Sequence, residues 1–334
     1  QELQYKPTQS QKDTGSVSLP LRWQGDVIVA GGGPAGIGAA IAAARSGAKT
    51  LLVEEYGFLG GMCAYGSGMP IGGAYPGYKP IGGIAEEILS TLRESGKESP
   101  DVRDVKNFGY WYFHDSDYFR TVAARKVVDS GAEPLFHTYV GDVVVDGGKI
   151  NGLVVSNKAG LDGVVADAFV DCTGDADVAA MAGAPFVTGR ESDGAFMAVT
   201  IPYIMFDVDV EKVLAYREQD EDFAKAKRKA AEEGVALSSE DKFKSTTVHA
   251  GIRPNTLFSN IVRVRNVDAT DPWAVTRAEI EARKRIYQHL EFFRRYVPGC
   301  ENAYVGKTGE QAGIRDSRRI VGEAKLVAED GTTF

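Results

Sequence analysis

An uncharged run covers residues 27–44, and its eighteen positions reach the length of a membrane-spanning helix. Its interior argues against a membrane span, because residues 31–34 read Gly-Gly-Gly-Pro and would break a helix. The pattern instead predicts a short strand over residues 27–30, a glycine turn, and a helix of small residues over 35–46. A second buried strand is predicted over residues 50–54.

This order of strand, glycine turn, helix and strand is typical of a dinucleotide-binding βαβ unit. Gly31, Gly33 and Gly36 have the G-x-G-x-x-G spacing. Gly31 would make the turn, Gly33 would let the backbone approach a pyrophosphate, and Gly36 would let the helix pack closely on the strand. Glu54 ends the second strand, where a carboxylate can accept hydrogen bonds from ribose hydroxyls. The alternative is a glycine-rich turn in an unrelated α/β fold.

The pattern elsewhere divides the chain into four parts. Residues 1–24 are polar and unpatterned, and we expect a flexible arm. Residues 25–184 are expected to form the nucleotide-binding domain, which includes a small antiparallel sheet between residues 133 and 171. Residues 185–310 are expected to form an inserted α+β substrate or cap region. Residues 311–334 would return toward the first domain.

Two helices are predicted in the cap region. Residues 210–234 are highly charged and indicate one solvated surface helix. Asp271 and Pro272 are a good N-cap and first residue for a helix that runs to Tyr296. Four residues at helical spacing would form its buried stripe: Ile286, Leu290, Phe293 and Val297.

Composition and charge narrow the class of protein. The chain of 334 residues is 43% hydrophobic and 25% charged, as in ordinary globular proteins. Its net charge of −8 argues against a nucleic-acid binder but leaves room for a local basic pocket. The three cysteines form no C-x-x-C pair, so neither a zinc site nor an iron–sulfur cluster is expected. We predict a cytoplasmic protein, but the chain begins with Gln1, which leaves export after signal cleavage open.

Two further segments favour FAD over NAD as the nucleotide. Residues 56–66 bring a second glycine pair, Gly60 and Gly61, shortly after Glu54. In flavoproteins such a loop can place backbone near the diphosphate and the ring, whereas an NAD dehydrogenase more often continues into another βαβ repeat. Residues 166–175 predict an apolar strand that ends in Asp-Cys-Thr-Gly-Asp. This resembles the strand–ATG–D signature of two-part FAD-binding domains, with Cys172 in place of the usual alanine.

Four stretches in order resemble the bacterial FAD-dependent oxidoreductases with a glutathione-reductase-type FAD fold. They are the βαβ unit with its "EEYGFLGGM" continuation, "GGIAEEIL", "VDCTGDADVAAMAGAPFVTGRESDG" and "GIRDSRRIVGE". The resemblance extends over residues 26–327 and implies an α/β fold, with a Rossmann-like FAD-binding domain of a parallel sheet plus a small antiparallel sheet. Members of this family continue beyond the last stretch with a segment that completes the flavin site. The flavin-ring end therefore has three alternatives: a cut chain, a second chain that supplies the remainder, or a differently bound ring.

The motifs and the resemblance together give the expected cofactor contacts. In similar proteins the backbone at a position like Val140 contacts adenine. The expected FAD-binding residues are Gly31, Gly33, Pro34, Ala35, Gly36, Glu54, Glu55, Gly60, Gly61, Met62, Cys63, Val140, Thr173, Gly174 and Asp175. No metal ligands are expected.

Candidates for chemistry are few. His114 and His249 stand in irregular, polar stretches, and either would take a substrate proton during hydride transfer, whereas His137 and His289 fit structural positions. Arg315 leads a basic cluster in "GIRDSRRIVGE", which we interpret either as surface charge at a helix N-terminus or as a clamp for a substrate carboxylate or a cofactor phosphate. Cys63 fits a small packed residue better than a redox-active thiol.

These observations predict an FAD-dependent oxidoreductase that transfers a hydride between a small organic substrate and flavin N5. The alternatives are an ADP- or FAD-binding subunit whose flavin site is completed elsewhere and, behind it, an NAD-dependent dehydrogenase. A small-molecule substrate is the expected partner, together with either a homo-oligomer or a completing second chain. Neither nucleic acid nor membrane is expected as a partner. The sequence leaves open the substrate, the direction of reaction and the electron acceptor.

Overall fold

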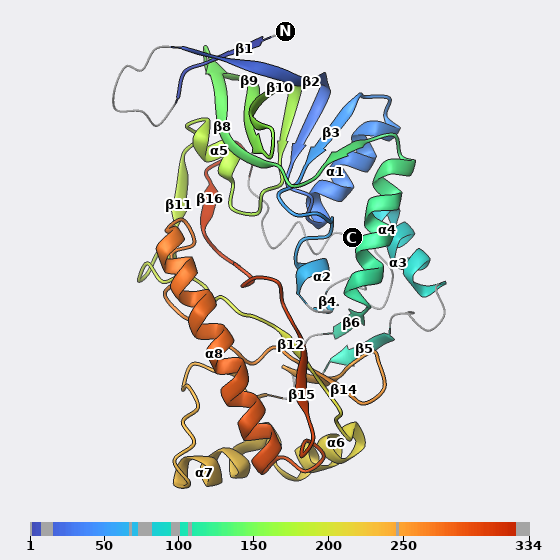
Figure 1. The fold of residues 1–334 in the computed structure, drawn as a ribbon, viewed down its shortest axis with the longest axis vertical. Helices are drawn as coiled ribbons and strands as arrows, with labels where there is room; N and C mark the ends of the chain where they lie inside the picture. The colour runs from blue at the N-terminus through green and yellow to red at the C-terminus, as the bar shows by residue number, and fades with distance from the viewer. Residues whose placement is uncertain are drawn as a thin grey trace.

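The computed structural model describes residues 2–7, 16–66, 69–72, 82–94, 101–105, 109–244 and 247–324. The molecule is elongated, with a large sheet at one end and the helices α6, α7 and α8 toward the other (Figure 1). The α/β class predicted from the sequence is confirmed.

The large sheet has seven strands, of which six follow the order β7-β3-β2-β10-β9-β8, while β1 pairs with β2. The four strands at one side of this order run parallel, and β10, β9 and β8 pair antiparallel. The second half of β10 is parallel to β2, so the predicted small antiparallel sheet continues the parallel one. The strands are β1 (Glu2–Tyr5), β2 (Val17–Ala30), β3 (Thr50–Val53), β7 (Glu133–Leu135), β8 (Tyr139–Asp146), β9 (Lys149–Asn157) and β10 (Gly160–Asp171).

The expectation of a flexible arm over residues 1–24 is wrong for the described part of that segment. Residues 17–24 are the first half of the long strand β2, and β1 pairs antiparallel with them. Inward and outward positions alternate along this half, with Leu19 buried between exposed neighbours. The sequence carries the same two-residue period, with apolar residues at positions 17, 19, 21 and 23, but the polar stretch before it led us to predict an arm over the whole segment.

Helices cover the large sheet and make its hydrophobic cores. One core lies between the sheet and α1 (Pro34–Arg45), α3 (Gly83–Arg93) and α4 (Ser116–Asp129), with Ile37, Ile41 and Leu52 fully enclosed. A second core contains the short helix α5 (Asp177–Met181) with β8, β9 and β10. Burying an Ile or Leu side chain stabilises a fold by about 1.5–3 kcal/mol, so these two layers fix the position of the glycine turn between them.

A small middle layer and the cap region complete the architecture. The short helix α2 (Met62–Tyr65) and the antiparallel strands β4 (Ile71–Gly72), β5 (Asp101–Val105) and β6 (Gly109–Phe113) lie between the large sheet and the cap. The cap has an antiparallel sheet in the order β13-β14-β12-β15, flanked by α6, α7 and α8. Its elements are β12 (Tyr203–Phe206), α6 (Val210–Gln219), the 3-10 helix η3 (Glu221–Phe223), α7 (Ala224–Glu232), β13 (Val248–Ala250), β14 (Thr256–Ser259), α8 (Pro272–Tyr296) and β15 (Tyr304–Thr308).

The single charged helix predicted over residues 210–234 is wrong, because the chain breaks at Asp220. Asp222 and Phe223 have φ angles of 58° and 54°, which end one helix before α7 begins. The Asp220 carboxylate accepts hydrogen bonds from the backbone N–H groups of Lys225 and Ala226 at 2.8 and 3.0 Å. An aspartate that satisfies these otherwise unpaired N–H groups stabilises the new helix start.

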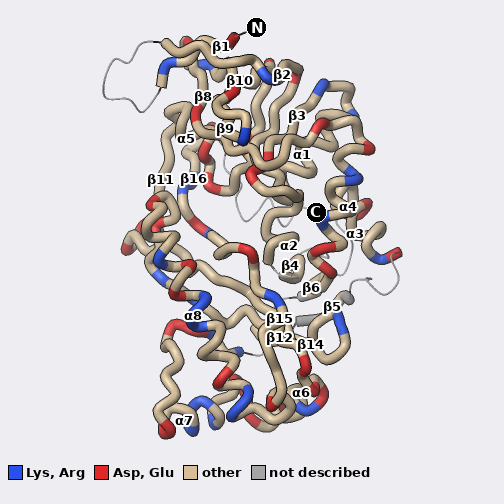
Figure 2. The backbone as a smooth tube through the Cα atoms, in the orientation of Figure 1, with Lys and Arg blue, Asp and Glu red and all other residues tan. Residues whose placement is uncertain are grey.

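Basic residues and glutamates are interspersed along α8, whereas α7 carries Lys225, Lys227, Arg228 and Lys229 before its one acidic residue, Glu232 (Figure 2). On α8, Arg285 pairs with Glu281 at 2.8 Å and Arg295 with Glu291 at 3.2 Å, one helical turn apart in each case. Among the described residues, no helix is both long enough and apolar enough to cross a membrane.

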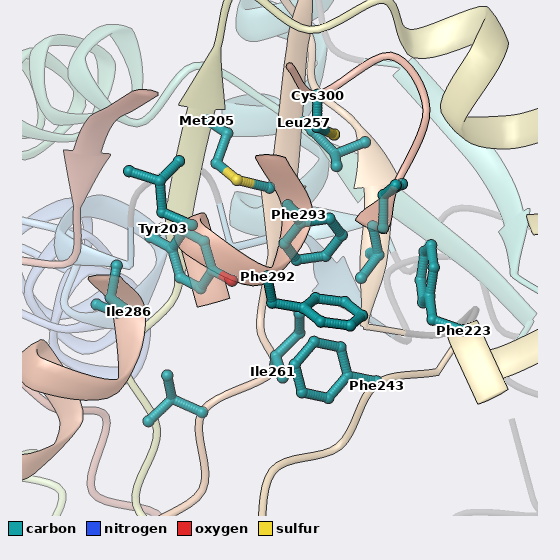
Figure 3. Close-up of a cluster of buried hydrophobic side chains, with 14 of the residues drawn as sticks. Tyr203, Met205, Phe223, Phe243, Leu257, Ile261, Ile286, Phe292, Phe293 and Cys300 are labelled. Carbon is teal, nitrogen blue, oxygen red and sulfur yellow. The ribbon is translucent and has the colours of Figure 1, made fainter. Parts of the chain in front are cut away.

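The predicted helix from Asp271–Pro272 to Tyr296 is confirmed as α8. The Asp271 carboxylate accepts from the Trp273 N–H at 2.9 Å, and the four predicted stripe residues are all buried. The core beneath it is aromatic (Figure 3): the ring centroids of Phe243 and Phe292 are 5.1 Å apart and those of Phe292 and Phe293 are 5.5 Å apart. Such tilted pairs stabilise beyond their buried area, so the cap has a core of its own.

The chain then returns from the cap to the large-sheet end of the molecule (Figure 1). Strand β16 (Arg318–Ile320) pairs antiparallel with β11 (Phe186–Thr188), the strand that leads into the cap. The entry and exit of the cap region therefore lie side by side next to α5.

Candidate cofactor site

The first glycine turn has the geometry that its motif predicts. Gly31 has φ +95°, and its N–H donates to the Val53 carbonyl at 2.8 Å. A Cβ atom at Gly31 would overlap the Cys172 carbonyl oxygen, and one at Gly36 would overlap the Gly31 carbonyl oxygen. Only glycine fits at these two positions, because the backbones of β2, α1 and residue 172 meet there.

The second glycine pair lies directly against the first, as the sequence suggested. The Gly60 N–H donates to the Gly32 carbonyl at 2.8 Å, and Gly61 has φ +48°. Gly33 differs from its neighbours: its φ of −68° suits any residue, and the nearest atom to an added Cβ would be the Gly61 Cα at 4.0 Å. Gly33 therefore needs no glycine for folding, and the space beside it is free of protein.

The open space beside Gly33 lies at the start of α1. Gly33 is the N-cap of this helix and Pro34 its first residue, and no side chain caps the helix N-terminus. Ala35 is exposed there, and no side chain of the protein accepts a hydrogen bond at the helix N-terminus. Unpaired N–H groups and the helix dipole favour an anion at this point.

Glu54 fixes the glycine turn through hydrogen bonds to the backbone. Its carboxylate accepts from the Gly32 N–H at 2.6 Å and from the Tyr56 N–H at 2.9 Å, and it is 6% exposed. Burial raises the pKa of Glu54 above its ordinary value, although these two hydrogen bonds oppose the shift. The ribose acceptor predicted here is thus also a brace for the turn, while the adjacent Glu55 is exposed.

The third segment, residues 172–175, meets the glycine turn from β10. The Cys172 N–H donates to the Ala30 carbonyl at 2.8 Å, and the Thr173 hydroxyl donates to Asp171 at 2.7 Å. Gly174 has φ +86°, and nothing lies within 4 Å of an added Cβ. The structure therefore brings together three of the predicted segments, 31–36, 60–63 and 172–175, which we call the glycine cradle.

Three carboxylates, those of Glu55, Asp175 and Asp177, lie near one another beside the cradle. The carboxyl groups of Asp175 and of Glu55, whose side chain as a whole is exposed, are partly shielded from water; this shielding and the charges of neighbouring carboxylates that include Asp177 raise both pKa values. The same three carboxylates raise the pKa of the Tyr139 hydroxyl, after burial. Tyr139 was missed by sequence reasoning, because it precedes the predicted adenine contact Val140 in an ordinary strand pattern. Within the described ranges, no group of three His, Cys, Asp or Glu side chains is arranged to hold a metal ion.

Met62 and Cys63 lie on α2 at the inner end of the cradle. An added Cβ at Gly313 would lie 3.0 Å from the Met62 sulfur, so this side chain packs on the returning chain. Burial raises the pKa of the Cys63 thiol to about 12, which keeps the thiol protonated at neutral pH. Cys63 therefore fits the packed residue favoured from the sequence.

Of the two candidate histidines, His114 lies in the irregular segment expected for it but is buried, and His249 lies in a strand. His114 is 1% exposed, and its Nε2 donates to the Cys63 carbonyl at 2.8 Å, which requires the proton on that nitrogen. Burial lowers the pKa of His114, so the ring is neutral. His249 lies in strand β13, where its ring centroid is 5.2 Å from that of Phe113 and 6.4 Å from that of Phe258.

The basic cluster lies on strand β16 and on the residues just before it. The interpretation of this cluster as a helix N-terminus is therefore wrong. The Ser317 hydroxyl donates to the Asp175 carboxylate, and Arg318 donates to the Asp175 carbonyl at 3.1 Å and to Asp177 at 2.7 Å. Arg315 and its neighbours line a cavity of about 700 Å³, of which sequence reasoning missed the opposite wall. The lining residues are Gly174, Arg190, Glu191, Ala195, Phe196, Met197, Arg315, Asp316, Ser317, Arg318 and Arg319.

Comparison with known proteins agrees with this geometry. The family model described as FAD dependent oxidoreductase matches residues 26–333. Thiamine thiazole synthase of Methanococcus aeolicus is 34% identical over 164 residues, which cover 46% of this chain and 57% of that protein. Thiamine thiazole synthase of Aeropyrum pernix is 31% identical over 140 residues, 42% of this chain and 46% of that protein. The chain thus spans about half the length of these relatives.

Solved structures share the fold at low sequence identity. The myxobacterial chondrochloren halogenase CndH has a TM-score of 0.53 and 15% identity, covering 91% of this chain and 66% of that chain. A geranylgeranyl bacteriochlorophyll reductase-like protein from Thermoplasma acidophilum has a TM-score of 0.52 and 16% identity, covering 87% of this chain and 66% of that chain. The family match extends over nearly the whole chain, and the glycine cradle lies inside it. The chain belongs to the FAD-dependent oxidoreductases, a family of enzymes whose cofactor is FAD.

Proposed function

We propose that this chain binds FAD in the glycine cradle and holds a small organic substrate for hydride transfer to or from flavin N5. The observation that carries the proposal is the close approach of the two glycine turns at the uncapped start of α1, where an added Cβ at Gly61 would lie 3.0 Å from the Cα of Gly33. Neither glycine has a side chain to keep a ligand away from the backbone here, and the helix N-terminus next to them attracts a pyrophosphate. The residues present therefore fit the cofactor of the family.

The other predicted contacts fit around this centre. Glu54 uses one acceptor site on each oxygen for the turn, which leaves acceptor capacity for a ribose hydroxyl, and the exposed Glu55 lies beside it. The backbone near Val140 would contact adenine. Thr173, Gly174 and Asp175 would hold the opposite end of the cofactor, where Gly174 leaves its surroundings open.

In this proposal the residues of the chain hold FAD and the substrate in place, and the flavin carries out the hydride transfer. FAD, when bound, supplies the hydride-carrying ring. His114 fixes the carbonyl of Cys63 and so the loop that contains Gly60 and Gly61. A neutral, fully buried ring suits that task better than proton transfer to a substrate. His249, on the cap side, stays a candidate proton acceptor.

Anaerobic mixing of the purified protein with a panel of small organic acids and polyols tests the function. Loss of the long-wavelength flavin absorbance with one compound, and its return with an electron acceptor, is the expected result. Protein that retains FAD but is reduced by no compound until a candidate partner chain is added would favour the alternative, a cofactor-binding subunit of a larger assembly. A protein that retains nicotinamide nucleotide instead would contradict the proposal.

A further inference from the structure

The cavity of about 700 Å³ next to residue 174 has no role in holding the cofactor cradle together. One wall is Gly174, whose peptide belongs to the third segment of the cradle. The other walls come from the turn after β11 and from the segment before and within β16. Its size lies within the usual range of about 300–1,000 Å³ for small-molecule sites. A molecule in this cavity would therefore border directly on the cofactor.

Three of the four arginines in the cavity wall already have partners. Arg190 pairs with Asp193, Arg318 pairs with Asp177, and Arg319 pairs with Asp316. Arg315 is different: it is exposed to the cavity, and among the described residues no carboxylate or carbonyl accepts a hydrogen bond from it. Its guanidinium thus keeps its donors available for a ligand.

A second guanidinium near Arg315 strengthens the positive potential there. Arg263 donates to the carbonyl oxygens of Asn260 and Val262 at 3.0 and 2.8 Å, which are neutral acceptors. Burial and the charge of Arg315 together lower the pKa of Arg263 to about 10, so the two charges act on each other. An anion at Arg315 would relieve this repulsion, whereas a neutral ligand would not.

Part of the cavity wall is apolar, although Glu191 also lines the cavity. Ala195, Phe196 and Met197 line it, and Met197 is 50% exposed although it is a large hydrophobic residue. An apolar surface and an arginine without a described partner in one cavity suit a ligand with a carboxylate at one end and a hydrocarbon or aromatic body at the other.

We infer that this cavity binds the carboxylate of a small organic acid on Arg315, with the apolar body of the acid against Phe196 and Met197. The inference rests on the proposed function only for the role of this acid as substrate. The binding itself is a property of the cavity and is measured separately from flavin chemistry.

Calorimetric titration of the holoprotein with benzoate, and with benzyl alcohol as the uncharged control, tests the site. We expect benzoate to bind and benzyl alcohol to bind at least about tenfold more weakly, because only the carboxylate can form a charge-assisted pair with Arg315. Arg315→Gln should weaken benzoate binding about tenfold or more, while Arg315→Lys should restore part of it. Arg125→Gln is the matched control, because Arg125 is 82% exposed on α4.

Three results would overturn the inference. They are no binding of benzoate to the parent protein, equal binding by the parent and Arg315→Gln, or loss of FAD rather than of benzoate from Arg315→Gln, which would make Arg315 a cofactor clamp. Failure of the proposed function is distinguishable, because it would appear as absent or unreactive flavin with benzoate binding intact. Arg315 has no described partner, so the Gln variant should unfold at the parent temperature, and a thermal scan checks this.

Discussion

The carboxylate of Glu54 accepts a hydrogen bond of 2.6 Å from the backbone N–H of Gly32, in the middle of the glycine turn. The acid that would bind ribose thus also fixes the turn that would bind pyrophosphate. Two parts of one site are coupled through a single buried side chain, so a change at Glu54 should alter both the fold of the turn and its affinity for FAD.

Glu54→Gln should destabilise the cofactor-free protein by about 1–3 kcal/mol. Glutamine has one acceptor oxygen, so its NH₂ group would face either the Gly32 or the Tyr56 N–H and leave that donor buried without a partner. Urea unfolding measures the change in the free energy of unfolding. A variant as stable as the parent would show that this carboxylate does not hold the turn.

Glu55→Gln should stabilise the cofactor-free protein more at neutral pH than near pH 4. Burial and the charges of Glu54, Asp177 and Asp175 raise the pKa of Glu55 in the folded state. Because the pKa of Glu55 is higher in the folded than in the unfolded state, Glu55 contributes fully to the free energy of unfolding below the unfolded-state pKa of about 4.3. This contribution is lost as the pH rises through the folded-state pKa. The Gln variant loses this pH dependence. Unfolding free energies of parent and variant at both pH values test it, and a pH-independent difference would contradict it.

Asp241→Ala should cost about 3–5 kcal/mol, because it breaks a fully buried polar pair. The side chains of Asp241 and His289 are 0% exposed, and Nε2 of His289 lies 2.7 Å from the Asp241 carboxylate. The backbone N–H of Arg263 also donates to the Asp241 carboxylate at 3.0 Å. As a matched control, Asp129→Ala removes an exposed partner of Arg125 and should change stability by about 0–1 kcal/mol. Equal effects in urea unfolding would show that the cap does not depend on the buried pair.

His114→Leu should raise the dissociation constant for FAD about two- to tenfold, the loss expected from one hydrogen bond. The variant no longer donates to the Cys63 carbonyl, so the loop with Gly60 and Gly61 would be less well fixed. His114→Gln has an amide donor that can replace the imidazole N–H, and it should recover part of the affinity. If both variants bind FAD like the parent, His114 is not a positioning residue.

The elements predicted best are those with local signals. Helices α1 and α8 and strand β3 were placed to within a residue or two, because glycines and Pro34 mark the start of α1 and Asp271–Pro272 mark that of α8. The end of β2 at Ala30 was also predicted, but not its start at Val17. The first half of β2 alternates between apolar and polar positions but was grouped with the polar stretch before it. The break at Asp220 depends on backbone angles that its charged neighbours do not indicate.

The site was predictable only in part for the same reason. Three segments of the cofactor cradle carry recognisable glycines, so the sequence could name them and the structure brings them together. The contacts of Ser317 and Arg318 with Asp175 and Asp177 join positions about 140 residues apart, and no local pattern predicts such a pairing. The burial of His114 against the Cys63 carbonyl and the pairing of His249 in strand β13 depend on segments far away in the chain, which no local pattern indicates.

Titration of the cofactor-free protein with FAD, compared between the parent and Gly33→Ala, tests the central claim most directly. An alanine Cβ at residue 33 would meet only the Gly61 Cα at 4.0 Å, so the fold should be kept while the approach of a pyrophosphate is blocked. Gly38→Ala is the control on the same helix, because nothing lies within 4 Å of its Cβ. We predict that Gly33→Ala loses at least about tenfold in FAD affinity with an unchanged unfolding temperature, while Gly38→Ala binds like the parent. Undiminished FAD binding by Gly33→Ala would contradict the placement of the cofactor in this cradle.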